Sequence, residues 1–303
     1  YVVITAGLGL AYLATGLGAE DSLVHAFTTI STGGFSSHAD SFVGFGSGPR
    51  VVATIGMILG GTSFAVIWWA VKGSTRSIWR STELRLYLGL IAAGSVLVTL
   101  GGDGVSVGDG IFTAVSAAST TGFAVGEWTL LADSVLMVLL VLIGTGAMSS
   151  SAGGGLGVIR AWTLVGFASR ELRRQLDTNS VVVVKQGGEP IDEHALDRVT
   201  GYQIGHLALC GVAAFLLAAS GLDLVGAVYT GMSVISTHGP GVGPGAFGSL
   251  ESFSPVARLV LVPFMLAGRL SIMPLLLAVS FAFNVENDLA RLGRRIVRKV
   301  FAR

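Results

Sequence analysis

The chain has 303 residues, of which 51% are hydrophobic and only 12% are charged, and it contains 44 glycines. A soluble domain carries about 25% charged residues, so the composition argues against a soluble globular enzyme and indicates a protein that lies in a bilayer. The net charge of +1 shows no nucleic-acid-binding footprint, and the single cysteine, Cys210, excludes an intramolecular disulfide.

Six apolar stretches are long enough to cross a bilayer, which takes about 20 helical residues. We expect membrane spans at residues 2–19, 50–71, 84–100, 134–165, 203–222 and 255–283. The fourth and the sixth are too long for one straight crossing. The pattern predicts an all-α polytopic membrane protein.

The fourth span carries glycines and serines in its middle, at Gly146, Ser149, Ser150, Ser151, Gly153, Gly154 and Gly155. Each glycine weakens a helix by about 1 kcal/mol relative to alanine, so we expect the helix to break here. Irregular backbone at membrane depth is tolerated only inside protein or along a water-filled cavity. The residues fit a movable, pore-lining loop, and equally a site where small residues let helices pack closely.

Three shorter apolar segments lie between pairs of spans, at residues 22–31, 110–119 and 224–236. A helix of ten residues is about 15 Å long, half of a hydrocarbon core of about 30 Å. We expect each segment to be a re-entrant half-helix that enters the membrane without crossing it. An acidic residue opens each one: Asp21, Asp109 and Asp223.

A related S-T-x-G sequence ends each half-helix: Ser31-Thr32-Gly33-Gly34, Ser119-Thr120-Thr121-Gly122 and Ser236-Thr237-His238-Gly239. A repeat of span, half-helix, loop and span determines the architecture of the whole chain. Glycine permits backbone conformations that other residues avoid, and carbonyl oxygens gathered around one axis can replace the hydration shell of a monovalent cation. The partly negative C-terminal end of each half-helix favours a cation over an anion.

Charged residues outside the spans separate into two sets. The side with the S-T-x-G loops holds nine acidic residues and two basic ones, Arg50 and Arg258, whereas the other side holds sixteen basic and nine acidic residues. Because cytoplasmic segments favour Lys and Arg, we expect the S-T-x-G loops to face outward and the C-terminus to be cytoplasmic. Arg269, the one charge within a span, is expected to bond to carbonyls of the glycine- and serine-rich loop; a snorkelling arginine is the alternative.

The chain resembles the Trk/Ktr/HKT superfamily of potassium transporters, and within it the prokaryotic TrkH subunits. Five stretches carry the resemblance: FTTISTGGFSSHADS (27–41), SAASTTGFA (116–124), SSSAGGGLGVIR (149–160), STHGPGVG (236–243) and MLAGRL (265–270). It implies a pseudo-fourfold, potassium-channel-like fold of four helix–pore helix–helix units.

Three of these units fall within the sequence. By resemblance, residues 1–71 form the second unit, residues 72–165 form the third with a broken gate helix, and residues 200–283 form the fourth. Residues 166–199 would be a cytoplasmic loop, expected to hold a helix end and a short hairpin, and residues 284–303 a basic cytoplasmic tail. Nothing before Tyr1 supplies the first unit, so we expect the sequence to be part of a longer protein of a prokaryotic cytoplasmic membrane.

The resemblance also assigns roles to residues. The selectivity filter would comprise Thr32, Gly33, Gly34, Thr120, Thr121, Gly122, Thr237, His238 and Gly239. Main-chain oxygens at Thr32, Gly33, Thr120, Thr121, Thr237 and His238 would hold potassium, the one cofactor expected. The loop at 146–155 would be the gate, faced by Arg269; the family usually has Glu after its Gly-Arg-Leu run, where this chain has Ser271. Phe35 and Phe123 are expected to pack behind the filter.

The resemblance further implies a TrkA-like cytoplasmic nucleotide-binding regulatory subunit and a homodimer, with membrane lipid as the other partner. Arg170, Arg173 and Arg174, together with the basic tail, could dock that subunit. Anionic lipid and membrane topology explain the same charges equally well.

Other functions remain open from the sequence. A sodium-permeable or sodium-cotransporting member of the superfamily would have the same fold. An intramembrane serine hydrolase would need a contact between a serine such as Ser63 or Ser149 and a histidine such as His206. A membrane scaffold would conduct nothing.

Overall fold

The computed structural model is helical almost throughout. It describes residues 1–102, 104–126, 131–177, 185–186, 189–239 and 253–270. The tail at 284–303 and the second part of the last expected span, 271–283, lie outside the described residues.

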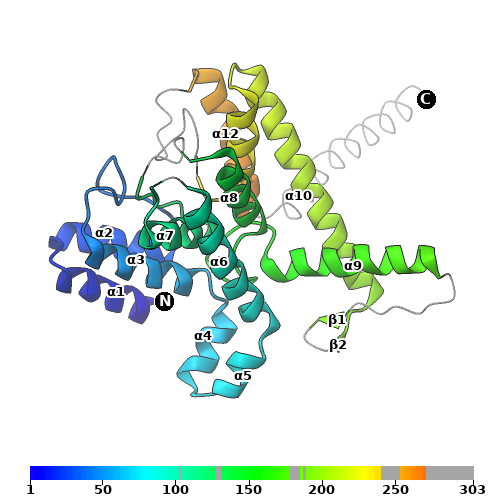
Figure 1. The fold of residues 1–303 in the computed structure, drawn as a ribbon, viewed down its shortest axis with the longest axis horizontal. Coiled ribbons are helices and arrows are strands. Elements are labelled where there is room, and N and C mark those ends of the chain that lie inside the picture. The colour runs from blue at the N-terminus through cyan, green and yellow to red at the C-terminus, as the bar shows by residue number, and fades with distance from the viewer. Residues whose placement is uncertain (103, 127–130, 178–184, 187–188, 240–252, 271–303) are drawn as a thin grey trace, which may run out of the picture.

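Twelve helices and one two-stranded ribbon occupy the described part of the chain (Figure 1). In chain order they are α1 (Val2–Ala14), α2 (Ala19–Ile30), α3 (Ser47–Gly60), α4 (Phe64–Val71), α5 (Thr75–Arg80), α6 (Thr82–Gly101), α7 (Val107–Ser119), α8 (Asp133–Thr145), α9 (Val158–Leu176), β1 (Lys185–Gln186), β2 (Glu189–Pro190), α10 (Glu193–Ala219), α11 (Leu224–Ile235) and α12 (Pro255–Leu270).

The helices associate in three groups of three. α2 packs against α1 and α3, α7 packs against α6 and α8, and α11 packs against α10 and α12. The groups contact each other in chain order, because α3 also meets α7 and α8 meets α11. The expected repeat of span, half-helix and span is therefore present in the packing.

The three middle helices are short, as expected. α2, α7 and α11 have 12, 13 and 12 residues, which corresponds to about 18–20 Å. Among the described helices, α6 and α10 are each long and apolar enough to cross a membrane, and α3 with α4 would make a third span if counted together.

The expected span at 50–71 is wrong in one respect, because it consists of two helices. α3 and α4 meet at an angle of 105° across a short break. Gly60 and Gly61 end the first helix, and the Ser63 hydroxyl accepts a hydrogen bond from Val66 N–H to cap the second. Because both helices are apolar, the hydropathy of the sequence does not reveal the break between them.

The fourth expected span breaks where the sequence predicts. α8 ends at Thr145, α9 begins at Val158, and the intervening loop contains the glycines and serines. The loop expected at 166–199 is largely helical, because α9 extends to Leu176 and α10 begins at Glu193, with the expected hairpin as β1 and β2 between them.

Two arginines of this region form ion pairs within the chain. Arg170 lies 3.1 Å from Glu171 and 3.6 Å from Glu193, and Arg174 lies 3.7 Å from Glu171. They join the end of α9 to the start of α10. Of the three arginines expected to dock a regulator, Arg170 and Arg174 are therefore occupied by structural contacts.

Arg50 at the start of α3 fastens the first two groups together. Its guanidinium donates to the carbonyl oxygens of Phe42 (3.2 Å) and Val43 (2.8 Å) and to Asp109 Oδ1 at the start of α7 (2.9 Å). Arg258 in α12 repeats one of these bonds, donating to Phe253 O at 3.0 Å. The N-terminal ends of α3 and α12 are thus each held by an arginine that donates to main-chain oxygens.

Replacement of Arg50 by alanine should lower the free energy of unfolding by about 1–2 kcal/mol. The loss is smaller than three charged hydrogen bonds suggest, because Asp109 stays partly in water. Thermal unfolding in detergent should show a midpoint several degrees lower, whereas Arg173→Ala, which removes an exposed arginine without a described ion pair, should leave it unchanged. Equal midpoints for the two variants would contradict this role of Arg50.

Candidate functional site

The three S-T-x-G loops have the same backbone conformation. Their threonines adopt the left-handed region, with φ of 52° at Thr32, 55° at Thr120 and 57° at Thr237. A β-branched residue rarely takes this conformation, which costs roughly 1–2 kcal/mol. Its recurrence at one position of three loops indicates that the surrounding structure imposes it.

Each half-helix ends in the same pair of hydrogen bonds. The threonine N–H donates to the carbonyl three residues earlier, and the next residue's N–H donates to the carbonyl five residues earlier. The pairs are Thr32 to Thr29 with Gly33 to Thr28, Thr120 to Ala117 with Thr121 to Ser116, and Thr237 to Val234 with His238 to Ser233. This is the Schellman ending, in which glycine normally takes the left-handed position.

The filter glycines lie against the neighbouring loop. A Cβ atom added to Gly34 would overlap the carbonyl oxygen of Thr121, and one added to Gly122 would overlap the carbonyl oxygen of His238. Both glycines have positive φ, as Gly239 does. A Cβ on Gly239 would meet no described atom within 4 Å. The first S-T-x-G loop therefore lies against the second, and the second lies against the third.

The loop between α8 and α9, which we call the intramembrane loop (146–157), lies directly against the filter threonines. Thr32 Oγ1 donates to Ala152 O at 3.0 Å, and Gly154 N–H donates to Thr120 Oγ1 at 2.7 Å. A Cβ on Gly154 would overlap Thr237 Oγ1. One loop thus contacts the left-handed threonine of all three S-T-x-G loops, and a glycine is needed at position 154.

Backbone hydrogen bonds close the base of the intramembrane loop. Leu156 N–H donates to Gly144 O, Gly157 N–H donates to Thr145 O, and Ala147 N–H donates to Gly154 O. Its other predicted members, Gly146, Ser149, Ser150, Ser151, Gly153 and Gly155, line a polar cavity of about 350 Å³ or lie in the same turn.

Arg269 reaches the intramembrane loop from α12. Its Nη1 donates to Ala152 O at 3.2 Å, so the carbonyl of Ala152 is shared between Arg269 and Thr32. The expected bond between this arginine and a loop carbonyl is present in the structure. Arg269 therefore joins the third group of helices to the intramembrane loop.

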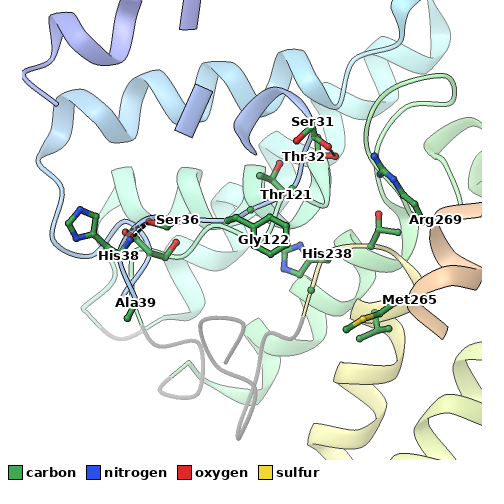
Figure 2. Close-up of a pocket in the computed structure, with 17 residues that line it drawn as sticks. Ser31, Thr32, Ser36, His38, Ala39, Thr121, Gly122, His238, Met265 and Arg269 are labelled. Carbon is green, nitrogen blue, oxygen red and sulfur yellow. Dashed lines mark hydrogen bonds between the residues drawn. The ribbon is translucent and has the colours of Figure 1, made fainter. Parts of the chain in front are cut away.

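A cavity of about 730 Å³ lies where the three loops face each other. Figure 2 shows Thr121, Gly122 and His238 side by side on its wall, with Arg269 and His38 towards opposite ends of the view. Among the described residues, no three His, Cys, Asp or Glu side chains gather as a metal site. Oxygen atoms of main chain and hydroxyl groups are therefore the ligands that this cavity offers to a cation.

Acidic residues at the starts of the half-helices place negative charge at the positive N-terminal ends of the helix dipoles. Asp223 caps α11, and Asp109 accepts from Ser106 in the first turn of α7. Ser37 donates to Asp21 Oδ1 at 2.6 Å, which lowers the pKa of that carboxyl. The positive N-terminal ends of the helix dipoles are thus compensated, and the negative ends meet the filter.

The sequence does not predict the hydrogen bonds that hold the segments following Gly34 and Gly122. His25 lies fully buried in α2, with Nε2 3.0 Å from Ser36 Oγ, and Ala124 N–H donates to Ser41 Oγ. The filter loops after Gly34 and Gly122 are joined in this way. Only contacts between distant parts of the chain reveal these roles, although a histidine inside an apolar half-helix was a visible signal.

One of the two expected packing phenylalanines differs from expectation. Phe123 is fully buried against Phe42, with ring centroids 4.7 Å apart. Phe35, in contrast, is 73% exposed and lines the larger cavity.

The hydrolase alternative is contradicted by the positions of its residues. Ser63 caps α4, while Ser149 Oγ and His206 Nε2 are buried and have no hydrogen-bond partner in the structure. Neither serine is therefore paired with this histidine, as nucleophilic catalysis requires.

Comparison with known proteins identifies relatives over nearly the whole chain. The family model TrkH, described as a cation transport protein, matches residues 11–100 and 86–288. The Trk system potassium uptake protein TrkH of Escherichia coli K12 is 29% identical over 93% of the chain and 60% of its own length. The corresponding protein of Salmonella typhimurium is 30% identical over the same shares.

A solved structure has the same fold. The crystal structure of the potassium transporter TrkH from Vibrio parahaemolyticus matches with a TM-score of 0.81 and 26% sequence identity, over 92% of this chain and 62% of that one. The chain thus spans about 60% of the length of the relatives it matches. The half-helices, the S-T-x-G loops and these matches agree, and the chain belongs to the TrkH family of cation transport proteins.

Proposed function

We propose that the protein takes up potassium across a prokaryotic cytoplasmic membrane, with the S-T-x-G loops facing outward and the C-terminus in the cytoplasm. Residues 1–71, 72–165 and 200–283 would be the second, third and fourth pore units, joined by the cytoplasmic loop 166–199 and followed by the tail 284–303. The relatives are named Trk system potassium uptake proteins, and the charge distribution of the sequence favours this orientation.

The observation that carries the proposal is the common geometry of the three filter loops. The three loops share a left-handed threonine and a positive-φ glycine, a geometry that would direct equivalent carbonyl groups towards one axis. Rings of main-chain oxygens replace the hydration shell of potassium in known filters. Thr32, Gly33, Thr120, Thr121, Thr237 and His238 would supply these oxygens, and the half-helix C-termini would add negative potential.

We further propose that the intramembrane loop is the gate of this pathway. It lies against all three filter threonines, and Arg269 and Thr32 hold its Ala152 carbonyl. A cation leaving the filter would meet this loop and the Arg269 charge. Displacement of the loop would break the two hydrogen bonds to Ala152 O and the bond from Gly154 N–H to Thr120 Oγ1.

Partners follow from the same family. We infer a TrkA-like cytoplasmic nucleotide-binding regulatory subunit and a homodimer. Arg173 and the basic tail would remain for contacts with that subunit, since Arg170 and Arg174 pair with acidic residues of the chain.

Replacement of Gly122 by serine should reduce the rubidium-to-sodium uptake ratio by about tenfold or more, because a Cβ would displace His238 O and strain a φ of 92°. The measurement is tracer uptake by a potassium-uptake-deficient bacterium that expresses the full-length protein. Gly221→Ser is the matched control: its φ is 104°, but a Cβ there meets no described atom within 4 Å.

An unchanged ratio in Gly122→Ser, with normal membrane insertion, would contradict the filter assignment. Equal rubidium and sodium uptake by the unaltered protein would instead favour the sodium-permeable alternative.

Replacement of Arg269 by glutamine should raise rubidium flux about fivefold or more in the absence of any regulatory subunit. The substitution removes both the bond to Ala152 O and a positive charge beside the pathway. Flux into liposomes containing the purified full-length protein measures the effect, with Arg173→Gln as the charge-matched control. Flux equal to or below that of the control would argue against a gating role for Arg269.

A further inference from the structure

α4 and α5 form an arm, residues 64–80, that projects from the first part of the chain (Figure 1). The helices pack against each other and against the start of α6. Val66 is buried, and Trp69 and Ile78 are partly buried against the core. The opposite face of the arm is exposed, and within the described residues its one contact between aromatic rings joins Phe64 to Tyr1, at a centroid distance of 5.7 Å.

That exposed face combines indole rings with cations. Trp68 is 58% exposed and Trp79 is 69% exposed, and Lys72, Arg76 and Arg80 are exposed beside them. The Lys72 ammonium lies 5.0 Å from the Trp68 ring centroid. None of the three cations forms a salt bridge within the described residues, and the sequence from Phe64 to Thr82 contains no acidic residue.

This chemistry matches the surface of an anionic membrane. Tryptophan favours the level of the headgroups because one edge of its ring is apolar and the other polar. Juxtamembrane Lys and Arg are attracted to anionic phospholipids. The 105° bend after α3 turns α4 away from the direction of the preceding helix, which suits a segment that lies along a surface.

Both ends of the arm are bonded to adjacent residues of the intramembrane loop. At its start, Phe64 N–H donates to Ser150 O at 3.1 Å. Just beyond its end, Glu83 Oε1 accepts from Ser149 N–H at 2.5 Å. A movement of the arm would therefore pull on Ser149 and Ser150 from two sides.

The break between α3 and α4 strengthens this connection. Met148 N–H donates to Gly61 O at 3.0 Å, and Ala152 N–H donates to Gly60 O at 3.1 Å. Ala152 is the residue whose carbonyl Thr32 and Arg269 hold. A continuous series of hydrogen bonds thus leads from the arm to the filter.

We propose that the arm docks on anionic phospholipid headgroups, and that docking displaces the intramembrane loop and raises conduction. The proposed lipid binding is argued from the arm alone, whereas the proposed effect on conduction rests on the proposed function. The expected consequence is a transporter whose rate depends on the anionic lipid content of its membrane.

The test compares two variants with the same charge change: Arg76→Gln on the arm, and Arg198→Gln away from it. The full-length protein is reconstituted in phosphatidylcholine, with or without phosphatidylglycerol. Quenching of tryptophan fluorescence by brominated phosphatidylglycerol reports docking, with Trp68→Phe/Trp79→Phe identifying the signal from the arm. Rubidium flux reports conduction.

The arm variant should need about fivefold more phosphatidylglycerol for half-maximal quenching, and the control variant should match the unaltered protein. Phosphatidylglycerol should raise flux of the unaltered protein about fivefold or more, but not that of the arm variant.

Equal quenching in both variants would overturn the docking site. Lost quenching with a retained flux response would overturn the coupling alone. Stimulation of the unaltered protein, but not of the arm variant, by a soluble regulatory subunit in pure phosphatidylcholine would show that the arm binds a protein instead of lipid. Absence of flux in every membrane would refute the proposed function, while the quenching comparison would still decide the docking.

Discussion

Main-chain groups that leave a helix inside a membrane must find partners within the protein, and this constraint organises the structure. Helices are interrupted at five places around the S-T-x-G loops: the ends of α2, α7 and α11, the α3–α4 break and the α8–α9 break. The main-chain groups left free at one break bond to those of the other. Gly60 O and Gly61 O accept from Ala152 N–H and Met148 N–H, and Phe64 N–H donates to Ser150 O. The intramembrane loop can exist only because a second broken helix lies against it.

The same constraint explains the left-handed conformation of Thr32 and Thr120, whereas Thr237 Oγ1 is buried and has no hydrogen-bond partner among the described residues. A glycine at the left-handed position would cost less backbone strain, but it would have no hydroxyl group. The Thr32 hydroxyl donates to Ala152 O, and the Thr120 hydroxyl accepts from Gly154 N–H. Those hydroxyls supply partners for loop groups that the membrane would leave unsatisfied. The same hydrogen bonds therefore hold these threonines in the left-handed conformation and hold the intramembrane loop in place. A movement of the loop would change the contacts of the S-T-x-G loops.

Local signals in the sequence predict most of the fold, and contacts between distant residues account for the rest. The half-helices, the S-T-x-G repeat and the broken fourth span follow from length, glycine content and repetition. The bend after Gly60 was missed because a window of apolar residues averages over it, although Gly60-Gly61 followed by Ser63 is a helix stop and a helix start. The bonds that brace the site join residues as far apart as Thr32 and Ala152, or Arg50 and Asp109, and no local pattern indicates them.

The central claim is that the three S-T-x-G loops bind a dehydrated cation with main-chain oxygens. Anomalous diffraction from crystals of the full-length protein soaked in thallium, a heavy substitute for potassium, tests it most directly. The account predicts anomalous peaks between the three loops, next to the carbonyl oxygens of Thr121 and His238, and their loss when sodium replaces thallium. Peaks confined to acidic side chains at the surface, with none beside these carbonyls, would contradict it.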